Sequence, residues 1–258
     1  MANAKDVIVK VIPSKIANEF VKKHHYSGKV VNNSQLHFGC FLNNELHGVM
    51  SFGCSLDKRK VQSLVVHKNT NKPALWNEWL ELNRMAFDDF LPRNSESRCI
   101  SIALKLIRKN APHIRWIISF ADGTHCGDGT IYRASGFKLT NLSTSSMIEL
   151  PEKYWKYNGG GKYAHRMTLQ AKSNVMYKIM QKELNLNGEY KTMEWYAEKL
   201  HTKVVEGYQL RYIYILDKDY KLAVPIIPFS KIDELNAGMY KGKKITLKER
   251  HNLTEKNN

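Results

Sequence analysis

The stretch HIRWIISFADGTHCGDGTIYRASGF, which runs from His113 to Phe137, carries the strongest fold signal in the chain. It opens with the apolar run WIISF, which is typical of a short β-strand buried on both faces. A polar loop with three glycines follows the run. The pattern TIYRAS then predicts a short helix that ends at Gly136, a residue type suited to the position after a helix. Since Phe137 begins another apolar segment, we expect strand, loop, short helix and strand in succession.

Apolar periodicity extends this unit in both directions. Before it, the sequence predicts a strand at 6–12, a helix from Pro13, strands at 36–42, 46–52, 61–66 and 80–87, and a helix at 96–109 with Ser95 as its N-cap. After it, the sequence predicts strands at 138–142, 145–150 and 163–169, two basic helical segments within 172–203, and a hairpin of 208–216 with 220–224. This order indicates an α/β (α+β) protein with a mixed sheet covered by helices on both faces. We expect a catalytic domain at 1–170 and a basic C-terminal extension at 171–258, with a charged tail that frays after Lys244.

The composition is that of a strongly basic globular protein. Of 258 residues 43% are hydrophobic, and no run of 18 apolar residues could span a membrane. The N-terminus does not resemble a signal peptide, and the four scattered cysteines argue against a zinc ribbon and for a reduced, cytoplasmic setting. The net charge of +16 is shared by the parts before and after Pro151. It favours a polyanionic partner, with a generally basic surface as the alternative.

Several polar side chains stand where a mixed sheet binds ligands. Asp122 ends a central strand, and ligands bind beyond the carboxyl ends of such strands. His25 and Tyr26 follow the first helix and can be metal ligands, bases or nucleic-acid contacts, or a solvated helix end. Arg84 lies in a predicted central strand and needs a partner if it is buried, for which Glu81, Asp122 or a phosphate are the candidates.

Two basic segments are candidates for phosphate binding. Cations and hydroxyls at the start of the helix after Pro92 suit a phosphate, and the residues concerned are Arg93, Asn94, Ser95, Ser97 and Arg98. After Pro151, aromatic residues alternate with cations, a pattern that stacks bases and binds phosphates but also occurs in strands that pack into a core. The residues expected to contact DNA there are Tyr154, Lys156, Lys162 and Arg166.

The ending Tyr132-x-x-x-Gly136-Phe137, together with the order of elements, resembles the GNAT acyltransferases. In that family the tyrosine hydroxyl lies near the thiol end of coenzyme A and can act as a general acid. Taken by itself, the motif also describes a packed tyrosine and a helix-capping glycine. GNAT enzymes carry a glycine-rich loop before the helix that corresponds to 96–109. This chain has RNSESR at 93–98 instead, whose side chains hinder approach of a pyrophosphate to the backbone.

The motifs together resemble the Mom family of bacteriophage DNA-modification proteins. The likeness covers roughly residues 8–169 and rests on HYS at 25–27, ELNR at 81–84, the 93–97 loop, FAD at 120–122 and Tyr132. It implies a transferase that adds a carbamoylmethyl group to N6 of adenine in double-stranded DNA and so protects phage DNA from host restriction. Simple acylation would leave an amide on N6, so the methylene-linked group implies chemistry beyond acyl transfer.

Carried over residue by residue, the family likeness implies a catalytic set of His25, Tyr26, Arg84, Asp122 and Tyr132. It also implies a small-molecule group donor, an acyl-CoA such as acetyl-CoA, and an Fe(II) ion held by His25, Tyr26 and Asp122. Two alternatives stay open: a GNAT acetyltransferase that acts on a protein or small amine, and a non-catalytic DNA-binding protein. The oligomeric state, a dimer included, stays open too.

Overall fold

The computed structural model of the chain describes residues 3–55, 58–246, 248, 249 and 252. They form two compact units: unit 1 comprises Met1–Leu142 and Leu210–Asn258, and unit 2 is the inserted segment Ser143–Gln209. The boundary expected at residue 170 falls inside unit 2, and the segment expected as a C-terminal extension is divided between the units. Most of the tail expected to fray after Lys244 lies outside the described residues.

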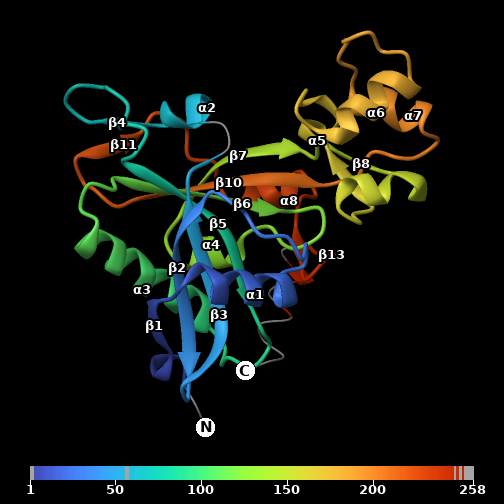
Figure 1. Cartoon of the computed structure of the whole chain (residues 1–258). Coiled ribbons are helices and arrows are strands. Elements are labelled where there is room, and N and C mark those ends of the chain that lie inside the picture. Colours follow the sequence, from blue (N-terminus) through green and yellow to red (C-terminus); the bar gives the residue numbers. More distant parts are fainter. Residues whose placement is uncertain (1–2, 56–57, 247, 250–251, 253–258) are drawn as a thin grey trace. The chain divides into compact units, whose positions relative to one another are not determined.

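A seven-stranded mixed sheet organises unit 1 (Figure 1), and the ends of β7 and β10 continue into unit 2. In spatial order its strands are β1 (Ile8–Val11), β2 (Ser34–Leu42), β3 (Glu45–Gly53), β5 (Trp79–Phe87), β6 (Trp116–Asp122), β10 (Tyr208–Ile215) and β7 (Lys138–Thr144). Neighbours from β1 to β5 pair antiparallel, whereas β5 and β6 run parallel. The predicted mixed sheet is confirmed.

Helices cover both faces of this sheet, as predicted. α1 (Ser14–His24) packs on β2, β3 and β5, and α3 (Ser95–Asn110) contacts β1. Adjacent residues of a strand point to opposite faces. On β2 the thiol of Cys40 is hydrogen-bonded to Cys99 of α3, while Phe41 packs in the apolar cluster that holds Ala17 and Val21 of α1. The two helices therefore lie on opposite faces.

The remaining elements of unit 1 are short: a 3-10 turn η1 (Ala4–Asp6), α2 (Lys58–Gln62), β4 (Val65–His67), α4 (Thr130–Ala134), β11 (Tyr220–Leu222), α8 (Ser230–Glu234), β12 (Met239–Tyr240) and β13 (Lys243–Lys244). Unit 2 contains β8 (Met147–Glu149), η2 (Glu152–Asn158), β9 (Tyr163–His165), α5 (Arg166–Gln170), α6 (Val175–Glu183) and α7 (Met193–Lys199). Unit 2 has its own apolar core, which includes Ile148, Tyr154, Met180 and Tyr196.

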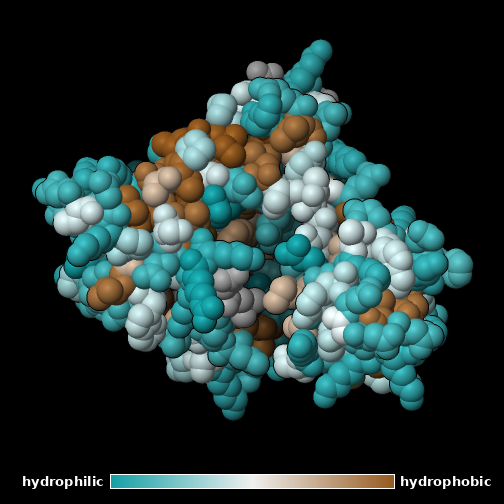
Figure 2. Space-filling model, turned by 90° about the horizontal axis from the view of Figure 1, so that it is seen from above, coloured by the Kyte–Doolittle hydropathy of each residue, from teal (hydrophilic) through white to brown (hydrophobic). Residues whose placement is uncertain are grey.

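The surface is mainly hydrophilic on the face shown in Figure 2, where a hydrophobic patch interrupts the polar residues. Among the described helices, none combines the length and the apolar composition that crossing a membrane requires.

Some strands differ from those expected. The segment 61–66 begins in helix α2, and only its last two residues belong to β4. The strand expected at 163–169 ends at His165, because the His165 Nδ1 atom accepts a hydrogen bond from the Met167 backbone N–H at 3.1 Å and so starts helix α5. Ser95 is not the N-cap of α3. Asn94 takes that position with a φ of 67° and without a side-chain capping bond.

The hairpin expected from β10 and β11 does not form. β10 enters the main sheet between β6 and β7, whereas β11 pairs antiparallel with β4, so that Tyr220 lies opposite His67. The turn between β10 and β11 bends the chain away from the main sheet: the Asp219 backbone N–H donates to Asp217 Oδ1 at 2.9 Å. The sequence therefore predicted the turn at 217–219 correctly, but it did not predict that β11 pairs with β4.

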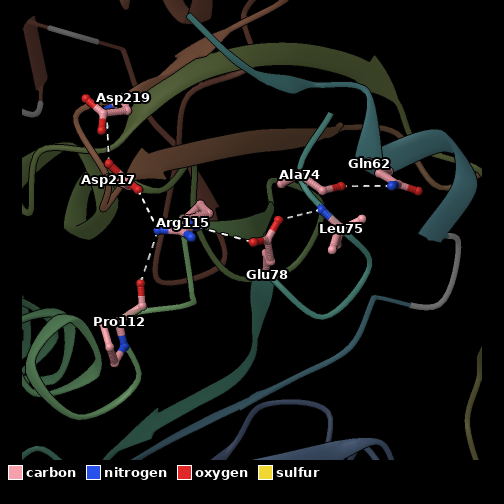
Figure 3. Close-up of polar contacts among 8 residues, drawn as sticks. All are labelled: Gln62, Ala74, Leu75, Glu78, Pro112, Arg115, Asp217 and Asp219. Atoms are coloured by element: carbon pink, nitrogen blue, oxygen red, sulfur yellow. Dashed lines mark hydrogen bonds and ion pairs between the residues drawn. The ribbon is translucent and has the colours of Figure 1, made fainter. Parts of the chain in front are cut away.

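An ion-pair cluster around Arg115 ties β5, β6 and the turn after β10 together (Figure 3). The Arg115 guanidinium donates to Asp217 Oδ2 at 2.7 Å and to Glu78 Oε1 at 3.4 Å, and it lies 5.7 Å from the centre of the Tyr220 ring. The second oxygen of Glu78 accepts from the Leu75 backbone N–H at 2.7 Å. Arg115 precedes β6 and Asp122 ends it, so this cluster stabilises the end of the sheet that lies away from Asp122.

Replacing Arg115 by alanine is expected to lower the free energy of unfolding by about 1–3 kcal/mol, because it leaves two carboxylates without their partner. The Glu78 and Asp217 side chains are only 16% and 21% exposed, so water restores their solvation incompletely. Urea unfolding of the variant measures the loss. The matched control is Arg108→Ala, which removes an exposed guanidinium from α3. Equal stability of the two variants would contradict the structural role of the cluster.

Candidate active site

Polar side chains gather where β5 and β6 separate. The two strands pair only along Trp79–Glu81 and Trp116–Ile118. Beyond these pairs the Ser119 hydroxyl on β6 donates to the Leu82 carbonyl on β5 at 3.2 Å. Side chains from the segment after α1 and from β5, β6 and α4 thereby come into one region of unit 1. Four of the five residues of the predicted catalytic set act on one another electrostatically there. The fifth residue, Tyr132, acts electrostatically on Arg84.

Asp122 is held by hydrogen bonds to both carboxylate oxygens. Oδ2 accepts from the Tyr26 hydroxyl at 2.9 Å, and Oδ1 accepts from the Thr124 backbone N–H at 2.9 Å and from the Thr124 hydroxyl. The His125 Nδ1 atom lies 3.9 Å from Oδ2. The side chain is 25% exposed. The carboxylate is therefore fixed in one orientation and still accessible to a ligand.

His25 and Tyr26 follow the end of α1, and their rings lie 4.4 Å apart. The His25 Nδ1 atom accepts from the Ser27 backbone N–H at 3.2 Å and lies 2.8 Å from the Ser27 hydroxyl, so the neutral ring carries its proton on Nε2. Burial, and then the charge of Arg84, lower the pKa of His25 to about 4. Burial of the hydroxyl and the neighbouring Asp122 raise the pKa of Tyr26, although 55% of that residue is exposed.

Arg84 satisfies its need for a partner with carbonyl oxygens. Its guanidinium donates to the Lys29 carbonyl at 2.9 Å and to the Asn83 carbonyl at 2.8 Å. Burial lowers the pKa of Arg84, while Tyr26 and Glu81 oppose that decrease. Neither carboxylate that we considered as a partner receives a hydrogen bond from it, so the guanidinium is positioned by the backbone.

Tyr132 on α4 is 7% exposed and packs between Phe137 and Tyr212, whose ring centres lie 5.5 and 5.3 Å away. Burial raises the pKa of Tyr132 to about 12, against a hydrogen bond with Ser119 and the charge of Arg84. The phenol is therefore protonated at neutral pH and can only donate a proton. Gly129, at the start of α4, has a φ of 84°, and a Cβ atom there would come within 2.4 Å of the Tyr212 ring.

The side chains of the predicted phosphate loop are largely engaged within the fold. Ser95 is fully buried, and its hydroxyl has no hydrogen-bond partner among the described residues. The Ser97 hydroxyl donates to the Asn94 carbonyl at 3.2 Å, and the Arg98 guanidinium donates to the Lys5 carbonyl at 3.4 Å. The backbone N–H groups at the start of this 16-residue helix can still attract an anion.

The predicted DNA-binding residues all lie in unit 2, and Tyr154 needs correction. It is 2% exposed and its hydroxyl donates to Glu183 Oε2 at 2.5 Å, so its ring belongs to the core and cannot stack on a base. Lys156 lies over the ring of Tyr157, which is 44% exposed. Lys162 forms an ion pair with Glu149 at 2.9 Å, and Arg166 is exposed at the start of α5.

The geometry does not support the expected iron site. In the part of the chain that the structure describes, no group of three or more His, Cys, Asp or Glu side chains is placed to hold a metal ion. The Tyr26 hydroxyl keeps its proton in the hydrogen bond to Asp122, and the His25 Nδ1 atom is hydrogen-bonded to Ser27. His25, Tyr26 and Asp122 each have a hydrogen-bond partner, with Tyr26 bonded to Asp122 and His25 bonded to Ser27. These side chains, called the hydrogen-bonded cluster below, are therefore not a set of free ligands.

Sequence reasoning missed two residues that position the cluster. Thr124 holds one oxygen of Asp122, and Ser119 bonds both Tyr132 and the carbonyl of Leu82. A signal for Thr124 was present, since Asp followed two residues later by Thr is a common local turn. Ser119 had no such signal, because its role depends on where β5 and β6 separate.

Arg84→Gln is expected to raise the pKa of His25 above about 4, because the guanidinium charge disfavours the imidazolium. Burial remains, so the value stays below that of an exposed histidine. NMR titration of the His25 ring measures the change, with Arg98→Gln as the control. The unfolded chain protonates His25 near pH 6.5, so the stability from the neutral ring is present above that pH and decreases as the pH falls towards 4. An unchanged His25 pKa would show that Arg84 does not act on the ring.

Comparison with known proteins places these residues in a family. The profile of the Mom protein family matches residues 6–231. The methylcarbamoylase Mom of Escherichia phage Mu is 36% identical over 169 residues, which are 65% of this chain and 64% of the phage protein. The match therefore spans slightly less than two thirds of that relative.

Solved structures of acetyltransferases also match the chain. A Bacillus subtilis acetyltransferase in complex with CoA is 8% identical, with a TM-score of 0.38 over 81% of this chain and 98% of that one. The ribosomal-protein-S18-alanine N-acetyltransferase of Escherichia coli is 7% identical, with a TM-score of 0.41 over 82% and 94% of the two chains. The family profile, in contrast, covers most of the chain and includes every residue of the hydrogen-bonded cluster, and the protein belongs to the Mom family.

Proposed function

We propose that the protein is a transferase that adds a carbamoylmethyl group to N6 of adenine in double-stranded phage DNA, in the cytoplasm of a bacterial host. Membership of the Mom family and the likeness to a phage methylcarbamoylase support this proposal. The observation that carries it is the Asp122 carboxylate, which is oriented by Tyr26 and Thr124 and remains accessible. The net charge of +16 suits a polyanionic substrate.

The target nitrogen is a weak nucleophile within a stacked helix. An enzyme that acts on it must turn the base out of the duplex and recognise its Watson–Crick edge. In this proposal Asp122 accepts a hydrogen bond from the N6 amino group, and orients the nitrogen or takes its proton when the new bond forms. His25 and Tyr26 lie beside that carboxylate and orient the base, Tyr26 through its partly exposed ring.

Tyr132 and Arg84 act on the group donor in this proposal. Because the phenol is protonated at neutral pH, Tyr132 donates a proton or a hydrogen bond to the donor as the group leaves. Arg84 is a cation held by carbonyl oxygens. Its remaining N–H groups make no other hydrogen bond to the described residues, so they can fix an anionic or carbonyl part of the donor.

The donor in this proposal is an acyl-CoA. Its pyrophosphate would bind at the start of α3, where helix N–H groups and the helix dipole favour an anion. The fit lies in the backbone, since Ser95 is buried and Arg98 is turned towards Lys5. Bound there, an acyl-CoA would supply an activated acyl group.

Unit 2 contributes to DNA binding in this proposal. Lys156, Lys162 and Arg166 bind backbone phosphates, and the exposed rings of Tyr157 and Tyr163 take the stacking role first expected of Tyr154. The cations of Lys156 and Lys162 already lie over these rings, an arrangement that leaves both groups at the surface.

The proposal is tested by digesting plasmid DNA from bacteria that express the protein with restriction enzymes whose sites contain adenine. Resistance that disappears in an Asp122→Asn strain is the expected result. A GNAT acetyltransferase for proteins or small amines would leave the DNA sensitive and bind acetyl-CoA without DNA. A non-catalytic DNA-binding protein would also leave purified DNA sensitive, and would keep its salt-dependent DNA affinity in the Asp122→Asn variant.

A further inference from the structure

A short hairpin near the C-terminus lies against the loop that follows Asp122. β12 and β13 pair antiparallel, with Met239 opposite Lys244 and Tyr240 opposite Lys243. Lys241 and Gly242 form the turn, with φ values of 46° and 77°. The hairpin lies beyond residues 6–231, which are those that the family profile matches. The match to the family profile therefore says nothing about the role of the hairpin.

Backbone hydrogen bonds fasten the hairpin to the active-site loop. The Asp128 N–H donates to the Met239 carbonyl at 3.0 Å, and the Gly242 N–H donates to the Cys126 carbonyl at 2.9 Å. The buried Asp128 carboxylate in turn accepts from the Met239 N–H at 3.2 Å. The same loop returns to Asp122, because the Cys126 N–H donates to the Asp122 carbonyl at 3.1 Å. The hairpin is thus a fixed neighbour of the proposed catalytic carboxylate.

The side chains of the hairpin form an exposed basic and aromatic edge. Lys241, Lys243 and Lys244 are exposed, and Tyr240 is 45% exposed. No described residue forms an ion pair or hydrogen bond with the Lys243 side chain. Lys241 pairs with Asp89 at 3.2 Å, but the two side chains are 70% and 98% exposed, so the pair is weak and a phosphate can replace the carboxylate.

We propose that the β12–β13 hairpin is a second contact for duplex DNA, which places backbone phosphates next to the loop of Asp122. Lys241, Lys243 and Lys244 neutralise phosphates, and Tyr240 packs against the sugar-phosphate backbone. This inference rests on the proposed function, since it names a contact made by the same substrate. A duplex fits better than an acidic protein because its phosphates recur along both strands and can reach the exposed cations of the turn and of β13.

The test compares the salt dependence of DNA binding by the full-length protein and two variants. The hairpin variant combines Lys241→Ala, Lys243→Ala and Lys244→Ala. The control combines Lys105→Ala, Arg108→Ala and Lys109→Ala, which removes three exposed cations from the later half of α3. Glu96, at the start of α3, acts electrostatically on Lys241, and Lys105 lies nine residues further, about 14 Å along the helix.

The plot of log K against log salt has a slope of about −0.9 per phosphate neutralised. The hairpin variant is expected to lose about 2–3 from the magnitude of this slope, and the control to keep the wild-type value. Lys243→Gln alone is expected to lose about 0.9 and leaves every described contact in place, so it serves if the triple variant is unstable. A hairpin variant with the wild-type slope overturns the inference.

Two further measurements distinguish a failure of the hairpin contact from a failure of the proposed function. If the wild-type protein leaves adenine unmodified, the proposed function fails whatever the slopes are. If the wild-type protein modifies adenine and the hairpin variants keep its slope, only the hairpin contact fails. A polyglutamate peptide is the second probe: equal losses for peptide and duplex would assign the edge to anions in general and overturn its assignment to DNA.

Discussion

Asp122→Asn is expected to lower the rate of adenine modification by about 10²–10⁴-fold, the usual contribution of a positioned acid or base. The amide keeps the size of the carboxylate but has only one acceptor oxygen, whereas Asp122 accepts from Tyr26 and Thr124 on different oxygens. The amide cannot accept both bonds, and it can no longer take a proton from N6. Time courses of modified nucleoside in DNA measure the decrease.

The control for this substitution is Asp219→Asn, which makes the same chemical change at an exposed carboxylate near the other end of the sheet. Its rate should equal that of the wild-type protein. Thermal unfolding checks that both variants fold. A folded Asp122→Asn variant with the wild-type rate would remove the carboxylate from the proposed site.

Tyr132→Phe is expected to lower the same rate by about 10²-fold or more without unfolding the protein. Phenylalanine preserves the packing against Phe137 and Tyr212, so the loss comes from the hydroxyl. Since the pKa of Tyr132 is about 12, the phenol remains protonated below that pH, and the wild-type rate should show no decrease from its ionisation between pH 6 and about 10.

Tyr214→Phe is the matched control, because Tyr214 also packs on Phe137, with ring centres 5.3 Å apart, and lies outside the hydrogen-bonded cluster. It should leave the rate unchanged. If Tyr132→Phe is as active as Tyr214→Phe, then Tyr132 is a packing residue, which is the alternative that its motif left open.

The centre of the fold could be predicted because its signals are local. The run WIISF lies within β6, and Gly136 has the positive φ of 86° expected after a helix. Long apolar periodicity likewise predicted α1 and α3. In each of these segments the residues that determine the structure lie within one turn or one strand of one another.

The parts that could not be predicted depend on partners far along the chain. β11 is defined by its pairing with β4, more than 150 residues earlier, and β10 joins the sheet only after the whole of unit 2. Tyr154 looked like a surface aromatic because cations surround it in sequence, yet the unit 2 core buries its ring. Neither the long-range strand pairing nor the burial of Tyr154 can be recognised from the neighbouring residues in the sequence.

The candidate site was predictable in its residues and not in its contacts. Family resemblance selected Tyr26 and Asp122, which are 96 positions apart and are hydrogen-bonded in the structure. It did not indicate that carbonyl oxygens hold Arg84 or that Thr124 orients the carboxylate, since both depend on how the backbone turns after α1 and β6.

Mass spectrometry of nucleosides is the most direct test of the central claim that the Asp122 cluster acts on adenine in DNA. DNA is prepared from cells that express the wild-type protein, the Asp122→Asn variant or the Asp219→Asn control. We predict a deoxyadenosine peak heavier by one carbamoylmethyl group for the wild-type and the control, and none for Asp122→Asn. An unmodified adenine pool with the folded wild-type protein, or the same peak from all three strains, would contradict the claim.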